Sequence, residues 1–376
     1  MKTETKIALT NGVALFAMFF GAGNLVFPLS LGSTAGSDIV SVWLAFIIAG
    51  VGLPFLGVFT ITLFRGDYWK FFSPLSKVLA FVVITFLILI IGPLFAAPRT
   101  ETVTFGSLQN LMPGFLQHHA AFSALYFLIV FLITVKQSHL TEVLGKILGP
   151  IKITVFVVLI IAAIWSGHHA TSTQQSSIDQ FSNSLSTGYN TMDLLAAFFF
   201  GGVIYQAILL RCSEHSIDFK TRAVPITLKS CVTGGVLLAI VYTGFMASAW
   251  LHADGLQGVP TASMVSAISM LVFGHAGQWF VCLCIALTCL ATASALAEVS
   301  SHYVYRFICR GKVPRLACLI FTLVFMYAMS LLGFDTIINL ASPILNYLYP
   351  LLIVFCVVRL VKYFYDHRRS KSVVAV

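Results

Sequence analysis

Charged residues are scarce in this 376-residue chain. Asp, Glu, Lys and Arg make up only 9% of it, and 59% of its residues are hydrophobic, whereas soluble domains carry about 25% charged residues. A soluble protein of this length would need about two or three domains, with almost no polar surface to cover them. The shortage of charge excludes an ordinary soluble fold and indicates an all-α polytopic membrane protein.

Signals of several function classes are also missing. No Gly-x-x-x-x-Gly-Lys motif is present, which argues against ATP drive, and no small-residue cleavage site follows the first apolar run, which we expect to be a retained span. The acids and histidines are scattered among loops and helix ends, so an enzyme is not expected. The eight cysteines fall in apolar runs or on one side of the membrane, so we expect no disulfide framework. No cofactor is expected, and no metal beyond a coupling cation.

Apolar runs fill most of the chain. Runs of about twenty residues match the roughly 30 Å hydrocarbon core of a bilayer, and their continuity argues against the alternating pattern of a β-barrel. The sequence predicts ten transmembrane helices, at residues 12–31, 39–64, 78–97, 121–135, 147–165, 192–210, 226–251, 278–305, 316–332 and 337–360.

The basic residues predict the orientation of these spans. If the N-terminus is cytoplasmic, 21 of the 22 Lys and Arg residues fall on the inner side, and Arg99 is the single outer one. Such asymmetry follows the positive-inside rule and requires an even number of spans, so both termini are expected in the cytoplasm. The net charge of +9 is then explained by a basic face near anionic lipid, and no nucleic-acid partner is expected.

A short internal repeat appears at the first span of each half. "MFFGAGN" begins at Met18 and "FFFGGVI" at Phe198. A unit of five spans is odd, so the second copy enters the membrane from the opposite face. We expect a single transmembrane domain over 1–376, with one repeat at about 7–166, an inverted repeat at about 190–364, and a short cytoplasmic tail at 365–376.

The glycines of this repeat predict broken helices 1 and 6. Glycine costs about 1 kcal/mol and proline about 3 kcal/mol in a helix interior, yet span 1 holds Gly21, Gly23, Asn24 and Pro28 near its middle. Paired interruptions at corresponding positions point to the binding site of a secondary transporter, with free carbonyls for a cation and a helix N-terminus for a carboxylate. The alternative is close helix packing at small residues.

Several motifs resemble one known family. They are "FFGAGNLVFP" in span 1, "GPLFAAPRTETVTF" from Gly92, "YNTMDLLAAFFFG" from Tyr189, "CLATASALAE" from Cys289 and "PILNYLYPLLIV" from Pro343. In this order they resemble the bacterial branched-chain amino acid:cation symporter family (LIVCS), which is placed with the leucine-transporter (APC-type) fold. The resemblance implies import of leucine, isoleucine and valine across the bacterial inner membrane, with a sodium ion or a proton.

The resemblance also implies a set of site residues. Substrate-binding residues would be Gly21, Ala22, Gly23, Asn24, Phe199, Phe200, Gly201 and Gly202, and cation-binding residues would be Ala17, Phe20, Asn24, Thr288, Thr292 and Ser294. A hydroxyl in an apolar helix has the alternative of bonding to its own backbone.

Two departures from the family pattern stand out. Ala291-Thr292 replaces a Thr-Thr pair and removes one hydroxyl from the expected sodium site. Most members also carry two more spans, although the predicted five-plus-five core is complete here.

Ionisable residues inside a bilayer are functional candidates. We expect Asp193 to be a partly wet acid at a helix start rather than a proton carrier, and Arg99 to be a gate or an ion pair, for example with Glu101. Glu298 and His302 form a possible proton relay, and the alternative is a polar face of the inner vestibule. The leading hypothesis is a sodium-coupled symporter with alternating access. Its alternatives are a proton-coupled transporter of other apolar amino acids, a membrane-embedded enzyme or a channel.

Overall fold

The structure is a computed structural model that describes residues 2–135, 148–167, 177–214 and 219–374. These residues form helices joined by short turns. In chain order the helices are α1 (Lys2–Phe19), α2 (Ala22–Thr34), η1 (Gly36–Asp38), α3 (Ile39–Ile47), η2 (Ile48–Gly52), α4 (Leu53–Leu63), α5 (Tyr68–Phe72), α6 (Lys77–Leu89), η3 (Ile90–Leu94), α7 (Ala96–Leu108), η4 (Gly114–Gln117), α8 (His119–Val135), α10 (Leu148–Ser166), α11 (Ser177–Tyr189), α12 (Asp193–Glu214), α13 (Phe219–Leu251), η5 (Ala253–Leu256), η6 (Thr261–Ser263), α14 (Met264–Tyr303), η7 (Val304–Ile308), α15 (Arg315–Ser330) and α16 (Phe334–Val374).

Within the described ranges, six helical stretches are long and apolar enough to cross a membrane, and the bent pair α1–α2 makes a seventh. Three shorter apolar helices, His119–Val135, Ile151–Ser166 and Arg315–Ser330, coincide with three further predicted spans. The polytopic all-helical class is therefore confirmed, and the count of ten spans remains a prediction.

The first predicted break is present. α1 ends at Phe19, Gly21 has an extended backbone (φ −121°, ψ −165°), and α2 starts at Ala22 after a bend of 75°. The last helical bond of this part runs from the Phe20 N–H to the Phe16 carbonyl, at 2.9 Å. The bend leaves the last carbonyls of α1 and the first N–H groups of α2 without helical partners.

The second predicted break was placed wrongly. α12 runs without interruption through Gly201 and Gly202, and the helix is instead broken at residues 190–192, where Met192 has a positive φ of 63°. A Cβ at Gly201 would lie 2.7 Å from Ile61 Cγ2, and a Cβ at Gly202 would lie 2.8 Å from the Gly66 carbonyl oxygen. These two glycines therefore allow α12 to pack closely against the preceding helices, which is the alternative considered from the sequence.

The described residues between the third and fourth predicted spans, and between the fifth and sixth, include further helix. The third predicted span continues past residue 97 in α7 to Leu108, so Arg99 lies inside the helical bundle. α11 occupies much of the second loop, and its first residues lie next to a segment outside the described ranges. α16 likewise continues beyond residue 360 into the predicted tail. These boundaries differ because polar helical turns next to a span carry no apolar signal.

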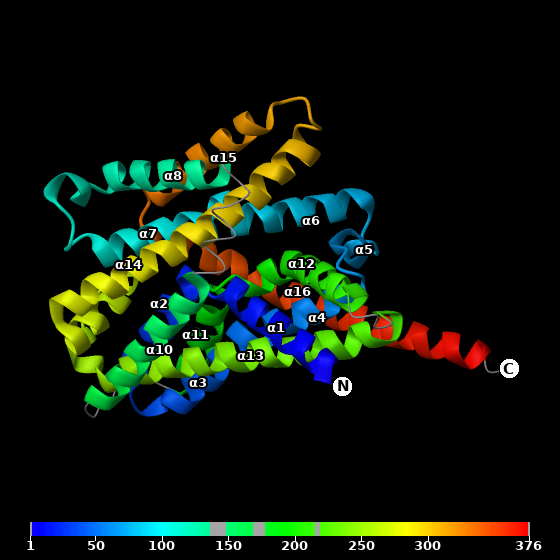
Figure 1. Ribbon diagram of the computed structural model, residues 1–376, viewed down its shortest axis with the longest axis horizontal. Coiled ribbons are helices and arrows are strands. Elements are labelled where there is room, and N and C mark those ends of the chain that lie inside the picture. Colours follow the sequence, from blue (N-terminus) through cyan, green and yellow to red (C-terminus); the bar gives the residue numbers. More distant parts are fainter. Residues whose placement is uncertain (1, 136–147, 168–176, 215–218, 375–376) are drawn as a thin grey trace.

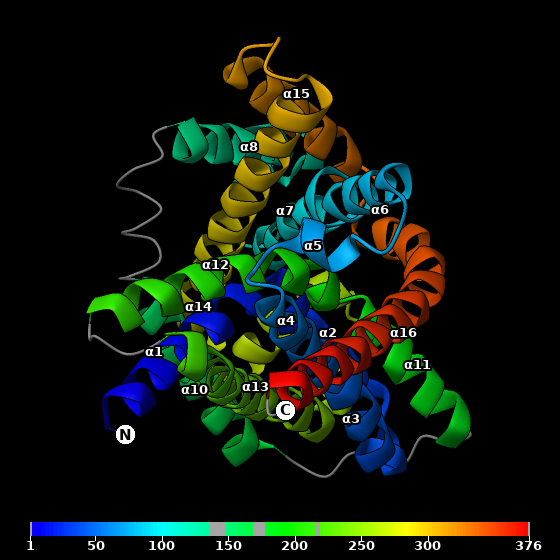
Figure 2. The ribbon, with the colours of Figure 1, turned by 90° about the vertical axis from the view of Figure 1, so that its right-hand side faces the viewer.

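Helix packing relates the two halves of the chain. α1 and α2 pack on α13, while α11 and α12 pack on α3 and α4, and α7 packs on α14. In Figure 1 the start of α1, α5 and the end of α16 all lie toward the right-hand end of the molecule, and Figure 2 looks onto this end. Both ends of the described chain therefore lie on the same side of the bundle.

Candidate functional site

The two helix breaks face a common cavity of about 50 Å³. The first break contributes Gly21, Ala22, Gly23 and Asn24, the second contributes Thr191, Met192 and Asp193, and neighbouring helices contribute, among others, Met18, Ile91, Arg99, Phe200, Thr292 and Leu296. A space of this size holds a few water molecules. An amino-acid side chain therefore requires some of these lining groups to move.

A buried acid lies at the centre of this site. Asp193 begins α12 and is 5% exposed, and its Oδ2 accepts a hydrogen bond from Asn24 Nδ2 at 2.7 Å and another from the Tyr242 hydroxyl at 3.3 Å. Asn24 Nδ2 also contacts the Tyr242 hydroxyl oxygen. The expectation of a partly wet acid was therefore wrong, and the Asn24 amide nitrogen faces the carboxylate. Tyr242 was missed because nothing in its span distinguishes it from a packing aromatic.

Arg99 joins the second break to the site. It is 3% exposed, and its guanidinium donates to the carbonyl oxygens of Asn190 and Thr191, the latter at 3.2 Å. Arg99 and Asp193 also attract each other electrostatically. The pairing of Arg99 with Glu101 was wrong, because residues two apart in a helix point to different faces, and the two side chains of α7 therefore meet different neighbours.

Glu101 instead belongs to a separate buried group. Its carboxylate accepts from Ser123 Oγ at 2.7 Å and lies 3.2 Å from His119 Nε2. The sequence gives no pattern for this contact, since it joins α7 to α8 across a turn.

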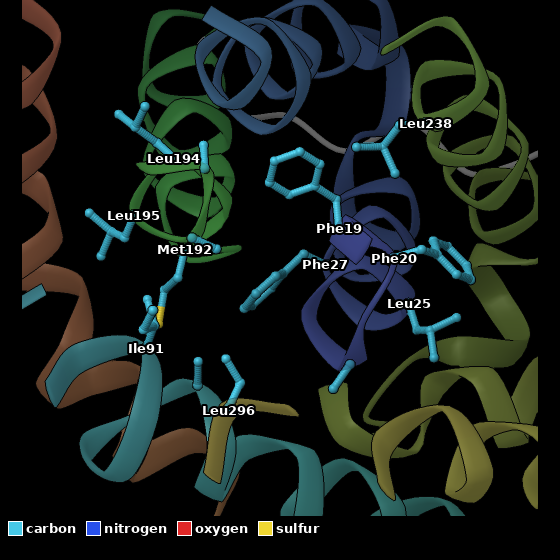
Figure 3. Close-up of a cluster of buried hydrophobic side chains, with 14 of the residues drawn as sticks. Phe19, Phe20, Leu25, Phe27, Ile91, Met192, Leu194, Leu195, Leu238 and Leu296 are labelled. Carbon is cyan, nitrogen blue, oxygen red and sulfur yellow. The ribbon is translucent and has the colours of Figure 1, made fainter. Parts of the chain in front are cut away.

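Apolar side chains surround the polar centre. Phe19 packs edge-on against Phe200 with ring centroids 5.3 Å apart, and the Arg99 guanidinium lies 5.2 Å from the Phe27 centroid. Figure 3 shows Phe19 and Phe27 projecting from α1 and α2 toward α12, with Met192 beside Ile91. Of the two phenylalanines predicted to bind substrate, Phe200 lines the cavity, whereas Phe199 packs against Tyr68 with ring centroids 5.2 Å apart.

Four of the six predicted cation residues line a second, larger cavity of about 410 Å³, whereas Asn24 borders the small cavity and Phe20 borders neither. Ala17, Thr288, Thr292 and Ser294 all border the larger cavity, and Thr292 borders the small cavity as well. The three hydroxyls donate to carbonyls one turn earlier on α14, at 2.8, 3.1 and 2.8 Å respectively. These four residues therefore lie around one cavity next to the first break, and their role as a cation site stays a prediction.

A lysine absent from the predicted set also lies in this cavity. Lys152 of α10 borders it, and its Nζ lies 3.4 Å from the Phe20 carbonyl oxygen and 5.7 Å from the Phe20 ring centroid. A sodium ion and an ammonium group would repel each other here, and Ala291 offers no hydroxyl. These residues therefore do not fit a sodium ion.

Two other candidates lie away from both cavities. Glu298 pairs with Arg315 of α15, and His302 is exposed with its ring near Tyr305. Neither residue borders the cavities at the breaks, so the structure does not place a proton relay at the site.

Broken helices around a buried polar cavity, within a bundle of apolar helices, are the architecture of a membrane transporter. The solved structure of MhsT in complex with L-phenylalanine matches this chain with a TM-score of 0.60, covering 89% of this chain and 85% of that one, at 20% identity. The likeness shows a shared fold.

The sequence model of the family described as branched-chain amino acid transport protein matches residues 4–376, and the chain belongs to that family. The branched-chain amino acid permease BraB of Bacillus subtilis (strain 168) is 31% identical over 380 residues, covering 97% of this chain and 82% of the permease. BrnQ, a branched-chain amino acid permease of the same strain, is 29% identical and covers 94% of this chain and 80% of its own length. The family resemblance seen in the sequence is confirmed, and the protein is a transporter and not an enzyme.

Proposed function

We propose that this protein is a secondary active symporter that imports leucine, isoleucine and valine with a cation by alternating access. The observation that carries the proposal is the convergence of two helix breaks on one buried cavity that holds both Asp193 and Arg99. A zwitterionic amino acid needs partners for both of its charges, and the N-termini of α2 and α12 add positive potential for a carboxylate.

The apolar lining of the cavity suits the chemistry of a branched aliphatic side chain, which enters once some of the lining groups have moved. Met18, Ile91, Phe200 and Leu296 offer no polar partner to a substrate side chain. One methylene contributes only about 1–3 kcal/mol to selectivity, so the shape of this wall sorts leucine, isoleucine and valine from other apolar amino acids.

The packing of the helices supports a five-plus-five inverted repeat of ten spans. The broken span of the first half packs on α13, the second span of the other half. The broken span of the second half packs in the same way on α3 and α4, the second span of the first half. We place the start of the second repeat at α11 and both termini in the cytoplasm of a bacterium, with the spans in its inner membrane. The two ends of the described chain lie on the same side of the bundle, and this position supports the topology.

The family resemblance suggests sodium as the coupling ion, but the residues at the expected cation site do not fit it. A proton is the second candidate, and the position of Lys152 among the predicted cation residues favours it.

Uptake into proteoliposomes tests the proposal. Labelled leucine, isoleucine and valine are offered under a sodium gradient, a proton gradient or neither, with Asn24→Ala as the site variant and Lys229→Ala, on the exposed side of α13, as its control. We expect saturable accumulation under one of the gradients, lost in Asn24→Ala and kept in Lys229→Ala. Absence of accumulation of all three amino acids under both gradients would refute the assignment.

A further inference from the structure

The Lys152 ammonium lies where the sequence predicts a bound cation. We propose that it takes the place of a sodium ion at this site, so that amino-acid binding and transport by this protein do not require sodium. The inference rests on the proposed transport function, because it names the group that occupies the cation site of that transporter.

The position of Lys152 relative to the first break is the first argument. α1 ends at Phe19, and the Phe20 carbonyl that Lys152 contacts belongs to the negative end of this half-helix. A positive charge at a helix C-terminus stabilises the free carbonyls. A bound sodium ion would serve the same purpose, and a tethered ammonium serves it permanently.

The charge of the surrounding cavity is the second argument. The described residues that line it include no Asp or Glu, so none of them compensates a second positive charge beside Lys152.

The donor set is the third argument. Three hydroxyls line the cavity, and Ala291 stands between Leu290 and Thr292 where a further hydroxyl would face the same space. The missing hydroxyl at Ala291 and the ammonium of Lys152 lie in one cavity and have the same consequence. Each lowers the affinity of the site for sodium.

Equilibrium binding tests the inference on the purified full chain. Labelled leucine is titrated in sodium chloride and in choline chloride at equal ionic strength. We expect the two dissociation constants to agree within about twofold. A dissociation constant that falls tenfold or more in sodium would overturn the inference.

Substitution of the lysine sharpens the test. Lys152→Met keeps the length of the side chain without its charge, and we expect at least a tenfold loss of leucine affinity in choline chloride. The matched control is Lys229→Met, which removes an exposed lysine from α13 and should leave the affinity unchanged. If the Lys152→Met variant bound leucine in choline chloride as tightly as the unsubstituted protein does, the inference would be overturned.

A readout that needs no substrate separates this inference from the proposed function. The double variant Lys152→Met/Ala291→Thr restores an oxygen and removes the competing charge. We expect sodium to raise its melting temperature by about 2 °C or more and to leave that of the unsubstituted protein unchanged. The reverse pattern would overturn the inference, whereas loss of binding of all three amino acids in every salt would overturn only the proposed function.

Discussion

Substituting Gly23 by alanine tests whether Arg99 and the first break form one site. A Cβ at position 23 would lie 2.7 Å from Arg99 Nη2 and 3.1 Å from Phe27 Cε2. The guanidinium is buried and donates to the carbonyls of Asn190 and Thr191, so it has to leave at least one of them to make room. The added methyl group in α2 therefore disturbs the hydrogen bonds of Arg99 at the second break.

The expected magnitude follows from two opposing contributions. A hydrogen bond from a charged donor contributes about 1.5–3 kcal/mol. Replacing glycine by alanine within a helix stabilises the helix by about 1 kcal/mol, which offsets part of this loss. The net cost is about 0.5–2 kcal/mol, which corresponds to a leucine dissociation constant raised about 2- to 30-fold. We expect the loss to appear in binding, because the displaced groups line the cavity.

Gly21→Ala is the matched control. A Cβ there would meet Thr292 Cγ2 at 3.4 Å, an ordinary contact, and its φ of −121° suits any residue. We expect leucine affinity within about threefold of the unsubstituted protein, measured by equilibrium binding beside a thermal unfolding curve. Equal affinities of the Gly21→Ala and Gly23→Ala variants would refute the reasoning, because the displacement of Arg99, which only Gly23→Ala causes, would then have no effect on leucine binding.

Three further substitutions probe charge and packing. Asp193→Asn replaces the charged acceptor of Asn24 and Tyr242 by a neutral one. A hydrogen bond to a charged group contributes about 1.5–3 kcal/mol, so we expect a lower melting temperature together with loss of leucine uptake. Glu101→Gln keeps an oxygen for Ser123 but loses the charge, so we expect a destabilisation of about 1–2 kcal/mol, seen in thermal unfolding, with leucine affinity unchanged. Gly202→Ala places a Cβ 2.8 Å from the Gly66 carbonyl oxygen. Overpacking costs about 1–3 kcal/mol, and we expect it to lower the melting temperature while the folded fraction binds leucine normally. For the last two, a changed dissociation constant with an unchanged melting temperature would contradict these assignments.

The first break could be predicted because its residues carry a strong backbone signal. Gly21, Gly23 and Pro28 are costly inside an apolar helix, and the structure bends the chain by 75° at this place. The apolar runs themselves were equally clear, since hydrocarbon leaves few alternatives to helices for a continuous run.

The second break could not be found in this way. Residues 190–192 contain neither glycine nor proline, and the paired glycines ten residues later drew the prediction to Gly201 and Gly202. A weaker signal was present, because Asn190 and Thr191 precede an acid at the start of an apolar run, as helix-starting residues often do. Glycine marks close approach as readily as it marks a break, and only the neighbouring helix distinguishes the two.

The burial of the two cations was missed for a different reason. The count of basic residues placed Arg99 on the outer side and Lys152 on the inner side, although Lys152 lies within the predicted span 147–165. The structure extends the third span through α7 and places Arg99 inside the bundle, while Lys152 lies in the second turn of α10. An error of about four residues in a predicted span boundary therefore decides whether a charged residue is assigned to a loop, where it only indicates the orientation of the spans, or to the bundle, where it can contribute to a site.

The two cations play parallel parts, and this parallel explains why a site with so few charges is stable in an apolar bundle. A helix broken within the membrane leaves carbonyls that hydrocarbon cannot satisfy. Arg99 donates to those at the second break and Lys152 to one at the first, each from a helix other than the broken one. Each side chain thereby ties a broken span to a neighbouring helix and sets the potential of the cavity beside it. A neutral substitution at either position changes both the shape and the charge of the site. A comparison of Arg99→Lys with Arg99→Gln separates these effects, because only the first keeps the charge.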